Sequence, residues 1–237
     1  MKKLLRNIYY YMSLLNKNYV PTIFMYHSIN ENDLFFSISK KDFEIQIKKL
    51  IDKGHNFINM DDIKSKNYNN MSVAITFDDG YKDNLLNALP ILEKYEIPAI
   101  IYVTKSLINN TNKYGLIGLN EQDLKYLFKH PLVTIGNHTL SHNKLHKLSY
   151  KEQFIDISEY NKYLEDLSGE KINHFAAPYG RYNEDTIKIL NELNFDTAVT
   201  VKRGNILNSK SLLELNRISI DKGKMNFIID YLTRFGK

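Results

Sequence analysis

Short apolar runs alternate with helical patterns along the chain from Pro21 onward. This alternation predicts strands of a mainly parallel sheet joined by helices that cover it. One long irregular connection interrupts the pattern between residues 104 and 118. Strands are expected at residues 22–26, 56–58, 73–77, 99–103, 133–135, 175–177, 197–200 and 215–220.

Polar capping residues mark where the predicted helices begin. Ser39 precedes an apolar stripe that stops at Gly54. Ser149 with Glu152 forms a capping box ahead of a second helix, which is expected to end near Gly169. Further helices are expected after Asn120, after Asn183 and over the C-terminal stripe of Met225, Ile228, Ile229 and Leu232.

The pattern describes an α/β protein with seven or eight strands and intervening helices in 237 residues. It predicts a distorted or incomplete (β/α) barrel of about seven parallel strands, and an open doubly wound sheet is the competing fold. Because no internal repeat or linker divides the sequence, residues 20–237 are expected to form a single domain. In either fold, active residues should follow the carboxyl ends of strands.

The chain contains no cysteine, which excludes disulfides and thiolate metal sites. Any metal must therefore be held by histidines and carboxylates. With 32 Lys+Arg against 27 Asp+Glu, the formal net charge is +5. This excess could favour an anionic membrane surface or an acidic polymer, but a solvated basic surface explains it as well, and no nucleic-acid partner is expected.

Residues 1–19 form a basic, aromatic segment ahead of the predicted domain. Its apolar stretch is short, rich in tyrosine and without a small-residue cleavage site, unlike a signal peptide. It is also too short to span a bilayer, which needs about 20 apolar residues. The segment is expected to lie on a membrane surface or to pack on the domain, so a cytoplasmic or membrane-peripheral location is favoured over secretion.

Two adjacent carboxylates follow the predicted strand at residues 73–77. Asp78 and Asp79 come directly before Gly80, which permits a sharp turn. Successive side chains of an extended backbone point in opposite directions, so one carboxylate could bind a metal while the other acts as a base. An Asp-Asp-Gly sequence is about as often a simple turn, so this motif needs support from other residues.

Histidines follow two other predicted strands. His138 and His142 are four residues apart after the strand at 133–135, a spacing that lets two imidazoles converge on one ion. His27 follows the strand at 22–26, where a lone histidine would be interpreted as structural. Pro178 and Gly180 fix a tight turn after the strand at 175–177, which could aim a backbone N–H into a pocket.

Three motifs, at residues 76–80, 138–142 and 177–180, occur in an order and spacing that resemble the polysaccharide deacetylase family, also known as carbohydrate esterase family 4 or the NodB-homology domain. The resemblance extends from about residue 20 to about residue 220. It implies Asp78 as general base; Asp79, His138 and His142 as ligands of a divalent ion, with Zn²⁺ favoured; and a substrate-binding turn of Pro178 and Tyr179, with the Tyr179 N–H as oxyanion donor.

The sequence departs from the family pattern at two positions. The family often has an arginine that orients the base where this chain has Ala176, and the late motif that normally supplies the acid histidine contains Arg217 instead. In this respect the chain is most similar to poly-N-acetylglucosamine deacetylases, whose acid comes from an N-terminal Tyr-His motif like Tyr26-His27. The resemblance therefore implies His27 as acid, with Arg217 or Arg181 orienting the base and Arg217 at the substrate site.

The resulting hypothesis is a metal-dependent hydrolase that removes N-acetyl groups from an N-acetylglucosamine-type polysaccharide or oligosaccharide and releases acetate. An O-acetyl polysaccharide esterase is one alternative, because an alkoxide leaves more easily than an amine. A noncatalytic carbohydrate-binding relic is another, favoured if Ala176 and Arg217 mark a dismantled site. The complete set of two aspartates and two histidines argues against a relic, which has no chemical need for all four.

Overall fold

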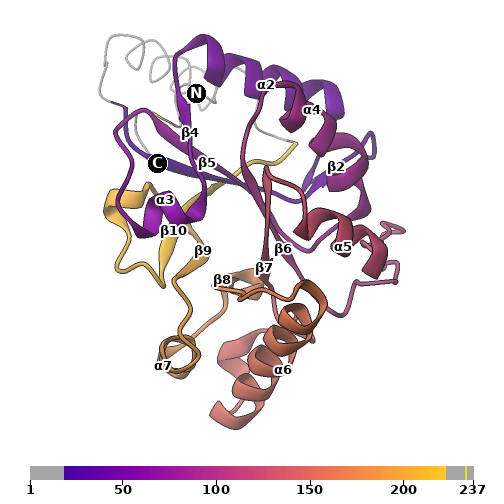
Figure 1. Cartoon of the computed structure of the whole chain (residues 1–237), viewed down its shortest axis with the longest axis vertical. Helices are drawn as coiled ribbons and strands as arrows, with labels where there is room; N and C mark the ends of the chain where they lie inside the picture. Colours follow the sequence, from indigo (N-terminus) through magenta and orange to yellow (C-terminus); the bar gives the residue numbers. More distant parts are fainter. Residues whose placement is uncertain (1–18, 223–232, 234–237) are drawn as a thin grey trace, which may run out of the picture.

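The chain is described here by a computed structural model, which places residues 19–222 and residue 233. Its centre is a barrel of parallel strands (Figure 1). The barrel strands are β1 (Thr22–Tyr26), β5 (Ser72–Phe77), β6 (Ala99–Val103), β7 (Val133–Asn137), β8 (His174–Ala176), β9 (Thr197–Arg203) and β10 (Leu215–Ser219).

β1 closes the barrel because it pairs with a strand on each side. Phe24 is in register with Ile75 of β5 and with Ile218 of β10, and both pairings are parallel. The predicted barrel of seven parallel strands is therefore confirmed, and the competing open sheet is wrong. An eighth strand, β4 (Asn56–Phe57), pairs with the first residues of β5.

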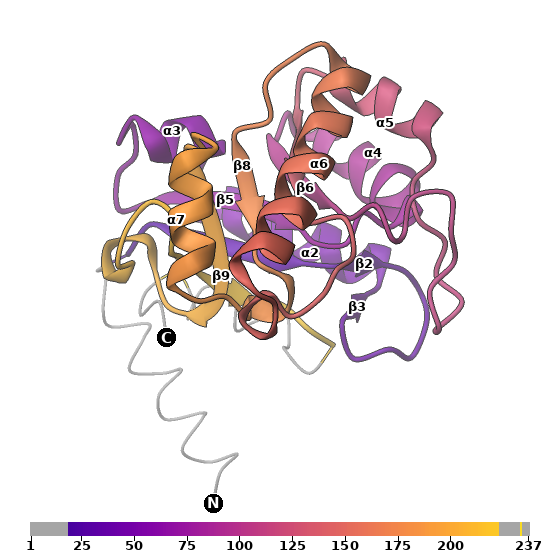
Figure 2. The same cartoon turned by 90° about the horizontal axis from the view of Figure 1, so that it is seen from below.

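Helices surround the barrel (Figure 1). In Figure 2, α6 and α7 lie side by side over β8 and β9. Four of the predicted helices lie where their caps place them, because the side chains of Ser39, Asn120, Ser149 and Asn183 accept hydrogen bonds from the first turns. The helices are α2 (Lys40–Asp52), α3 (Met60–Lys64), α4 (Leu89–Lys94), α5 (Glu121–Phe128), α6 (Tyr150–Ser168) and α7 (Glu184–Glu192), with a π-helical turn η1 (Asn84–Ala88) before α4.

Alternation along the strands divides the core into two layers. Residues such as Phe24 and Ile75 pack outward against the helices. Inward-facing residues, including Ile23, Ala74 and Ile100, fill the barrel together with side chains of α3. Near the carboxyl ends of the strands the inward positions become polar, so the chemistry-bearing residues lie at that end of a packed barrel.

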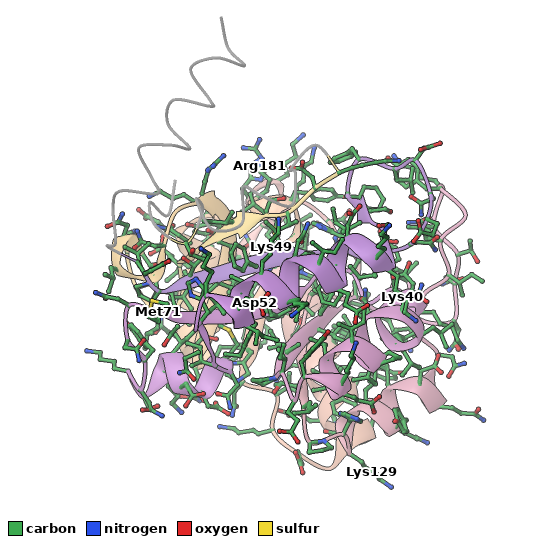
Figure 3. The ribbon with its side chains drawn as sticks, turned by 90° about the horizontal axis from the view of Figure 1, so that it is seen from above. Lys40, Lys49, Asp52, Met71, Lys129 and Arg181 are labelled. Carbon is green, nitrogen blue, oxygen red and sulfur yellow. The ribbon has the colours of Figure 1, made fainter. Side chains whose placement is uncertain are left out.

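Loops after β1 and β6 extend over the carboxyl ends of the strands. The first contains the short paired strands β2 (Ser28–Ile29) and β3 (Ser37–Ile38), and the second is the long irregular connection that the sequence predicts. Figure 3 looks onto α2, with Arg181, which follows β8, and Lys129, which precedes β7, at opposite edges of the molecule.

Some predictions fall on residues that the structure does not describe. These are the N-terminal segment up to residue 18 and the C-terminal stripe at residues 225–232. The proposed boundary near residue 19 and the membrane contact of the segment therefore stay predictions. Within the described part of the chain, no helix has the length and apolar character that a bilayer crossing requires.

Candidate active site

A cavity of about 640 Å³ opens at the carboxyl ends of the barrel strands. Most of the predicted site residues come from loops that follow four different strands, and Arg217 lies within β10. The fold brings them together because the carboxyl ends of these strands meet at one face. Those that line the cavity are His27, Asp78, Asp79, His138, His142 and Tyr179.

Asp79, His138 and His142 converge on one point of the cavity. Asp79 Oδ1 lies 3.5 Å from His138 Nε2 and 3.1 Å from His142 Nε2. The two Nε2 atoms are 3.3 Å apart. Within the described residues, this is a group whose donor atoms could hold a metal ion.

The donor spacing fits a tetrahedral ion. Zinc–ligand bonds of about 2.0–2.1 Å place neighbouring ligands roughly 3.3–3.4 Å apart in a tetrahedron. The three separations of 3.1, 3.3 and 3.5 Å bracket that value. A carboxylate with two imidazoles also leaves one tetrahedral position for water or substrate, as catalytic zinc sites require.

Hydrogen bonds orient the two histidines. The Nδ1–H group of His138 donates a hydrogen bond of 2.7 Å to the Ala176 carbonyl oxygen, so the lone pair of the ring lies on Nε2, which faces Asp79. The His142 backbone N–H donates to Thr139 Oγ1 at 3.0 Å. Ala176, where the family often has an arginine, thus serves the site through its backbone.

The site is also where the backbone is unusual. Four of the eight non-glycine residues with positive φ in the described chain belong to the three motifs. Such conformations are uncommon and cluster at functional sites, where the surrounding structure holds them. They are Asp79 (φ 73°), Thr139 (φ 68°), His142 (φ 56°) and Tyr179 (φ 56°).

The Asp79 carboxylate is held at both oxygens. Its Oδ2 accepts a hydrogen bond of 2.8 Å from the Tyr81 hydroxyl, which in turn accepts one from Asn112. Burial raises the pKa of the Asp79 carboxyl, but the hydrogen bonds with His138 and His142 outweigh it and hold the pKa well below its usual value. Asp79 is therefore anionic at neutral pH.

Asp78 forms a buried ion pair with Arg217 of β10. Two parallel hydrogen bonds join the guanidinium to the carboxylate, at 2.7 Å from Nη1 and 2.6 Å from Nη2. Arg217, which is 1% exposed, also donates to the Thr200 carbonyl and to Thr76 Oγ1. Of the two arginines expected to orient the base, Arg217 therefore contacts it, whereas Arg181 is exposed at the edge of the molecule (Figure 3).

The ion pair sets the charge of Asp78. Burial raises the pKa of the Asp78 carboxyl, but the charge and the hydrogen bonds of Arg217 outweigh burial and lower the pKa below its usual value. Asp78 is therefore ionised at neutral pH and can accept a proton.

His27 lines the same cavity, and no hydrogen bond joins its described atoms to Asp79, His138 or His142. Its ring is partly exposed, and its Nδ1 atom is buried without a hydrogen-bond partner among the described residues. Its carbonyl oxygen accepts a bond of 2.7 Å from the Asn84 side chain. The imidazole is thus free to meet a bound ligand, although its backbone is fixed.

The turn at Pro178–Gly180 lies beside the histidines. Pro178 is buried, whereas Tyr179 is 54% exposed and packs its ring 4.7 Å from that of His142. Gly180 has φ +62°, and a Cβ there would lie 2.2 Å from Val201 Cγ2, so the turn requires glycine. This geometry places the predicted turn at the cavity wall.

Other lining residues were missed by the sequence reasoning. Phe35 is 74% exposed, and its neighbour Phe36 stacks on Tyr81 and contacts the ring of Tyr114. Phe35 and Phe36 come from the loop after β1 and Tyr114 from the long connection after β6, at positions outside the sequence motifs, whereas Tyr81 directly follows the motif at residues 76–80. These aromatic residues give the cavity an apolar wall suited to the carbon face of a sugar.

Comparison with known proteins gives one family. A family model described as polysaccharide deacetylase matches residues 65–198, more than half of the chain. The Bacillus subtilis (strain 168) protein YxkH, described as a candidate polysaccharide deacetylase, is 29% identical over 206 residues, which cover 85% of this chain and 71% of YxkH.

Two further proteins are similar over most of the chain. The poly-beta-1,6-N-acetyl-D-glucosamine N-deacetylase of Staphylococcus aureus is 28% identical over 192 residues, which are 76% of this chain and 66% of that enzyme. The solved structure of the Streptococcus pyogenes deacetylase PplD, in complex with acetate, superimposes with a TM-score of 0.75 at 27% identity and covers 88% of this chain and 95% of that one.

Proposed function

The chain belongs to the polysaccharide deacetylase family, and on that premise we propose that it removes N-acetyl groups from an N-acetylglucosamine-type polysaccharide with the help of a divalent ion. The expectation of a deacetylase-type hydrolase is thereby confirmed at the level of the family.

One observation carries the proposal. The same cavity contains a triad that could hold a metal and a second carboxylate, that of Asp78, which is bound to a different partner. Asp79 offers its oxygen toward two imidazole nitrogens, while Asp78 beside it is bound to Arg217 instead. Adjacent aspartates thus have different partners, which is what a ligand and a base require. We assign zinc as the ion because histidine and carboxylate donors at tetrahedral spacing suit it.

Amide hydrolysis needs a nucleophile and a proton acceptor. An ion bound by Asp79, His138 and His142 would lower the pKa of a bound water and polarise the acetyl carbonyl. Asp78, ionised and held by Arg217, would accept the proton as water attacks the carbonyl carbon. Because Arg217 occupies both carboxylate oxygens from one side, it fixes the direction in which the base faces.

The tetrahedral oxyanion and the leaving amine need further groups. We assign the Tyr179 backbone N–H as a donor to the oxyanion, since its turn lies at the cavity wall beside His142. An amine leaves only when its nitrogen is protonated, and His27 is the further imidazole that lines the cavity. His27 would donate its proton to the nitrogen as the C–N bond breaks, giving acetate and a free amino sugar.

The buried Asp78–Arg217 pair bears on the noncatalytic alternative. A dismantled site was suggested by Ala176 and by the arginine in the late motif. In the structure Arg217 binds the proposed base directly, and Ala176 contributes a carbonyl to His138. Arg217 thus supplies the guanidinium that position 176 lacks, and His27 in the same cavity can replace the acid missing from the late motif, which favours an active enzyme over a relic.

Acetate release from N-acetylglucosamine oligomers, measured with and without a chelator, tests the proposal. Release that stops with chelator and returns with added Zn²⁺ is the expected result. Release from O-acetylated xylan oligomers alone would replace the proposal by the esterase alternative. No release from either substrate by metal-loaded protein would favour a binding protein.

A further inference from the structure

Two buried aspartates outside the cavity have the same kind of partner. Asp83 and Asp156 are 8% and 7% exposed, and neither lines the cavity. Each accepts hydrogen bonds from a serine hydroxyl and from a backbone N–H. In each case the serine is the chain neighbour of a histidine in the proposed site, Ser28 of His27 and Ser141 of His142.

Asp83 holds the chain just after His27. Its Oδ2 accepts from Ser28 Oγ at 2.6 Å, and its Oδ1 accepts from the Ile29 N–H at 3.0 Å. Two neighbours in η1 act on the same stretch, because Asn84 donates to the His27 carbonyl and Asn87 donates to the Ile29 carbonyl, both at 2.7 Å. Residues 83–87, which follow the Asp78–Asp79 pair, therefore hold the chain after β1 in place at His27 through these hydrogen bonds.

Asp156 of α6 holds the chain just before His142. Its two carboxylate oxygens accept from the Ser141 N–H at 2.8 Å and from Ser141 Oγ at 2.9 Å. Its backbone carbonyl also accepts from the Leu140 N–H at 3.1 Å. The loop in which His142 adopts its positive φ is thus fixed to a helix of nineteen residues.

Hydrogen bonds to a carboxylate are shorter and stronger than those between neutral groups. Replacing a buried aspartate by asparagine keeps the shape of the side chain but turns one acceptor oxygen into a donor NH₂ group. This NH₂ group then faces the serine hydroxyl or the backbone N–H whose hydrogen bond the oxygen accepted. A change of this kind moves the attached loop by a small amount without removing any atom from the cavity. At an active site, small displacements are costly.

We propose that Asp83 and Asp156 are positioning residues with separate tasks: Asp83, through Ser28, sets the place of the proton donor His27, and Asp156, through Ser141, sets the place of the metal ligand His142. The inference rests on the proposed roles of these histidines. Proton donation and metal binding would each depend on its own serine–aspartate contact, and the two contacts lie on different elements.

The test compares Asp83→Asn with Asp156→Asn on two substrates and in metal content. The substrates are an N-acetylglucosamine oligomer, whose amine must be protonated, and an activated aryl acetate, whose leaving group needs little protonation. Asp83→Asn should lower kcat on the oligomer by about 10-fold or more, change kcat on the ester less than about 3-fold, and keep the bound zinc. Asp156→Asn should lower both activities together and weaken zinc binding by about 10–100-fold, with recovery at high zinc concentration.

Control variants guard against general damage. Ser28→Ala and Ser141→Ala remove one hydrogen bond each, leave both carboxylates in place and should repeat the two patterns more weakly. Asp196→Asn, a partly buried carboxylate that pairs with Lys64 away from the cavity, should leave both activities within about 2-fold. If an aspartate variant does not fold, the matching serine variant decides.

The inference is overturned if Asp83→Asn and Ser28→Ala lower kcat on both substrates equally or release zinc. It is also overturned if the Asp156 and Ser141 variants leave kcat on the ester unchanged. His27→Ala measured in parallel separates this failure from failure of the proposed function. If His27→Ala shows the substrate difference and Asp83→Asn does not, the positioning role alone is wrong. If the parent protein releases no acetate, the proposed function fails and the inference fails with it.

Discussion

The cavity has two histidine-bearing regions that are built differently. In the region of His138 and His142, the reactive nitrogens lie within 3.5 Å of Asp79, and the Ala176 carbonyl fixes the His138 ring. In the region of His27, the ring Nδ1 has no hydrogen-bond partner among the described residues, and the fixed groups are the His27 carbonyl and the backbone N–H of Ile29. The first region brings together donor atoms that could hold an ion, and the second leaves an imidazole facing the cavity.

The difference reflects what each task requires. Metal ligands must keep their spacing before the ion arrives, so mutual contacts and carbonyl partners suit them. A proton donor must reach an atom of the substrate, so a partner that occupied its donor nitrogen would compete with the reaction. The comparison predicts that substitutions in the first region affect every reaction of the enzyme, whereas those in the second depend on the leaving group.

The largest effect is expected for His138→Ala. Loss of one of three ligands should release the ion and with it several kcal/mol of transition-state stabilisation, on the order of 10³–10⁴-fold in kcat for amide and ester substrates alike. Metal analysis of the purified variant together with both assays checks this. A variant that retained zinc and lost activity on the amide alone would erase the distinction between the two regions.

Asp78→Asn should follow, with a loss of about 10²–10³-fold on both substrates while zinc stays bound. The amide cannot accept the proton of the attacking water, but it keeps the shape of the side chain and lies outside the triad. Zinc content is the decisive measurement. If Asp78→Asn lost the ion and Asp79→Asn kept it, the roles of the two aspartates would be exchanged.

Arg217→Met should show its main effect in stability, and that effect should depend on pH. In the parent, the pKa of Asp78 is below its unfolded value of about 3.9, so the pair stabilises the fold above that pH and the contribution is lost as pH falls through the folded pKa. In the variant, burial loses the opposing charge and hydrogen bonds of Arg217, so the pKa of Asp78 should rise relative to the parent and its ionisation should contribute less to folding as pH rises.

The parent should therefore be more stable than Arg217→Met by about 3–5 kcal/mol near pH 7, and the difference should shrink toward pH 3. Urea unfolding at a series of pH values measures it. Arg217→Lys serves as the control, because it keeps the charge and loses the paired geometry. A difference that did not vary with pH would mean that the arginine acts by packing alone.

The smallest effect is expected for Tyr179→Ala. The proposed oxyanion donor is the backbone N–H, which alanine retains, so kcat should change by less than about 3-fold. The exposed ring beside His142 is available for contact with a sugar, and its loss should raise KM for oligomers several-fold. A large fall in kcat with unchanged KM would show that the side chain takes part in the reaction.

The fold could be predicted because its signals are local. The expected ranges for β1 and β6 agree with the structure residue for residue, since each is a continuous apolar run. β7 extends two residues past its predicted end to Asn137, because Gly136 and Asn137 pair with Tyr102 and Val103 of β6. Such contacts have no local signature.

The site also has one part that local sequence motifs predict and another that only the fold reveals. The triad could be proposed from the spacing of its motifs, and the structure brings its donor atoms together. The sequence does not decide between Arg181 and Arg217 as the partner of Asp78, because Arg217 is 139 residues away and only closure of the barrel brings β10 next to β1. The contacts of Asp83 could not be predicted, since they join two loops whose residues form no recognisable pattern.

The most direct test of the account is the substrate dependence of His27→Ala. The account predicts a loss of about 10²–10⁴-fold in kcat on an N-acetylglucosamine oligomer, because the leaving amine then lacks its proton donor. It predicts a loss of less than about 10-fold on an activated aryl acetate, with zinc content unchanged. Equal losses on the two substrates, or loss of the ion, would contradict the division between a metal-holding region and a proton-donating one.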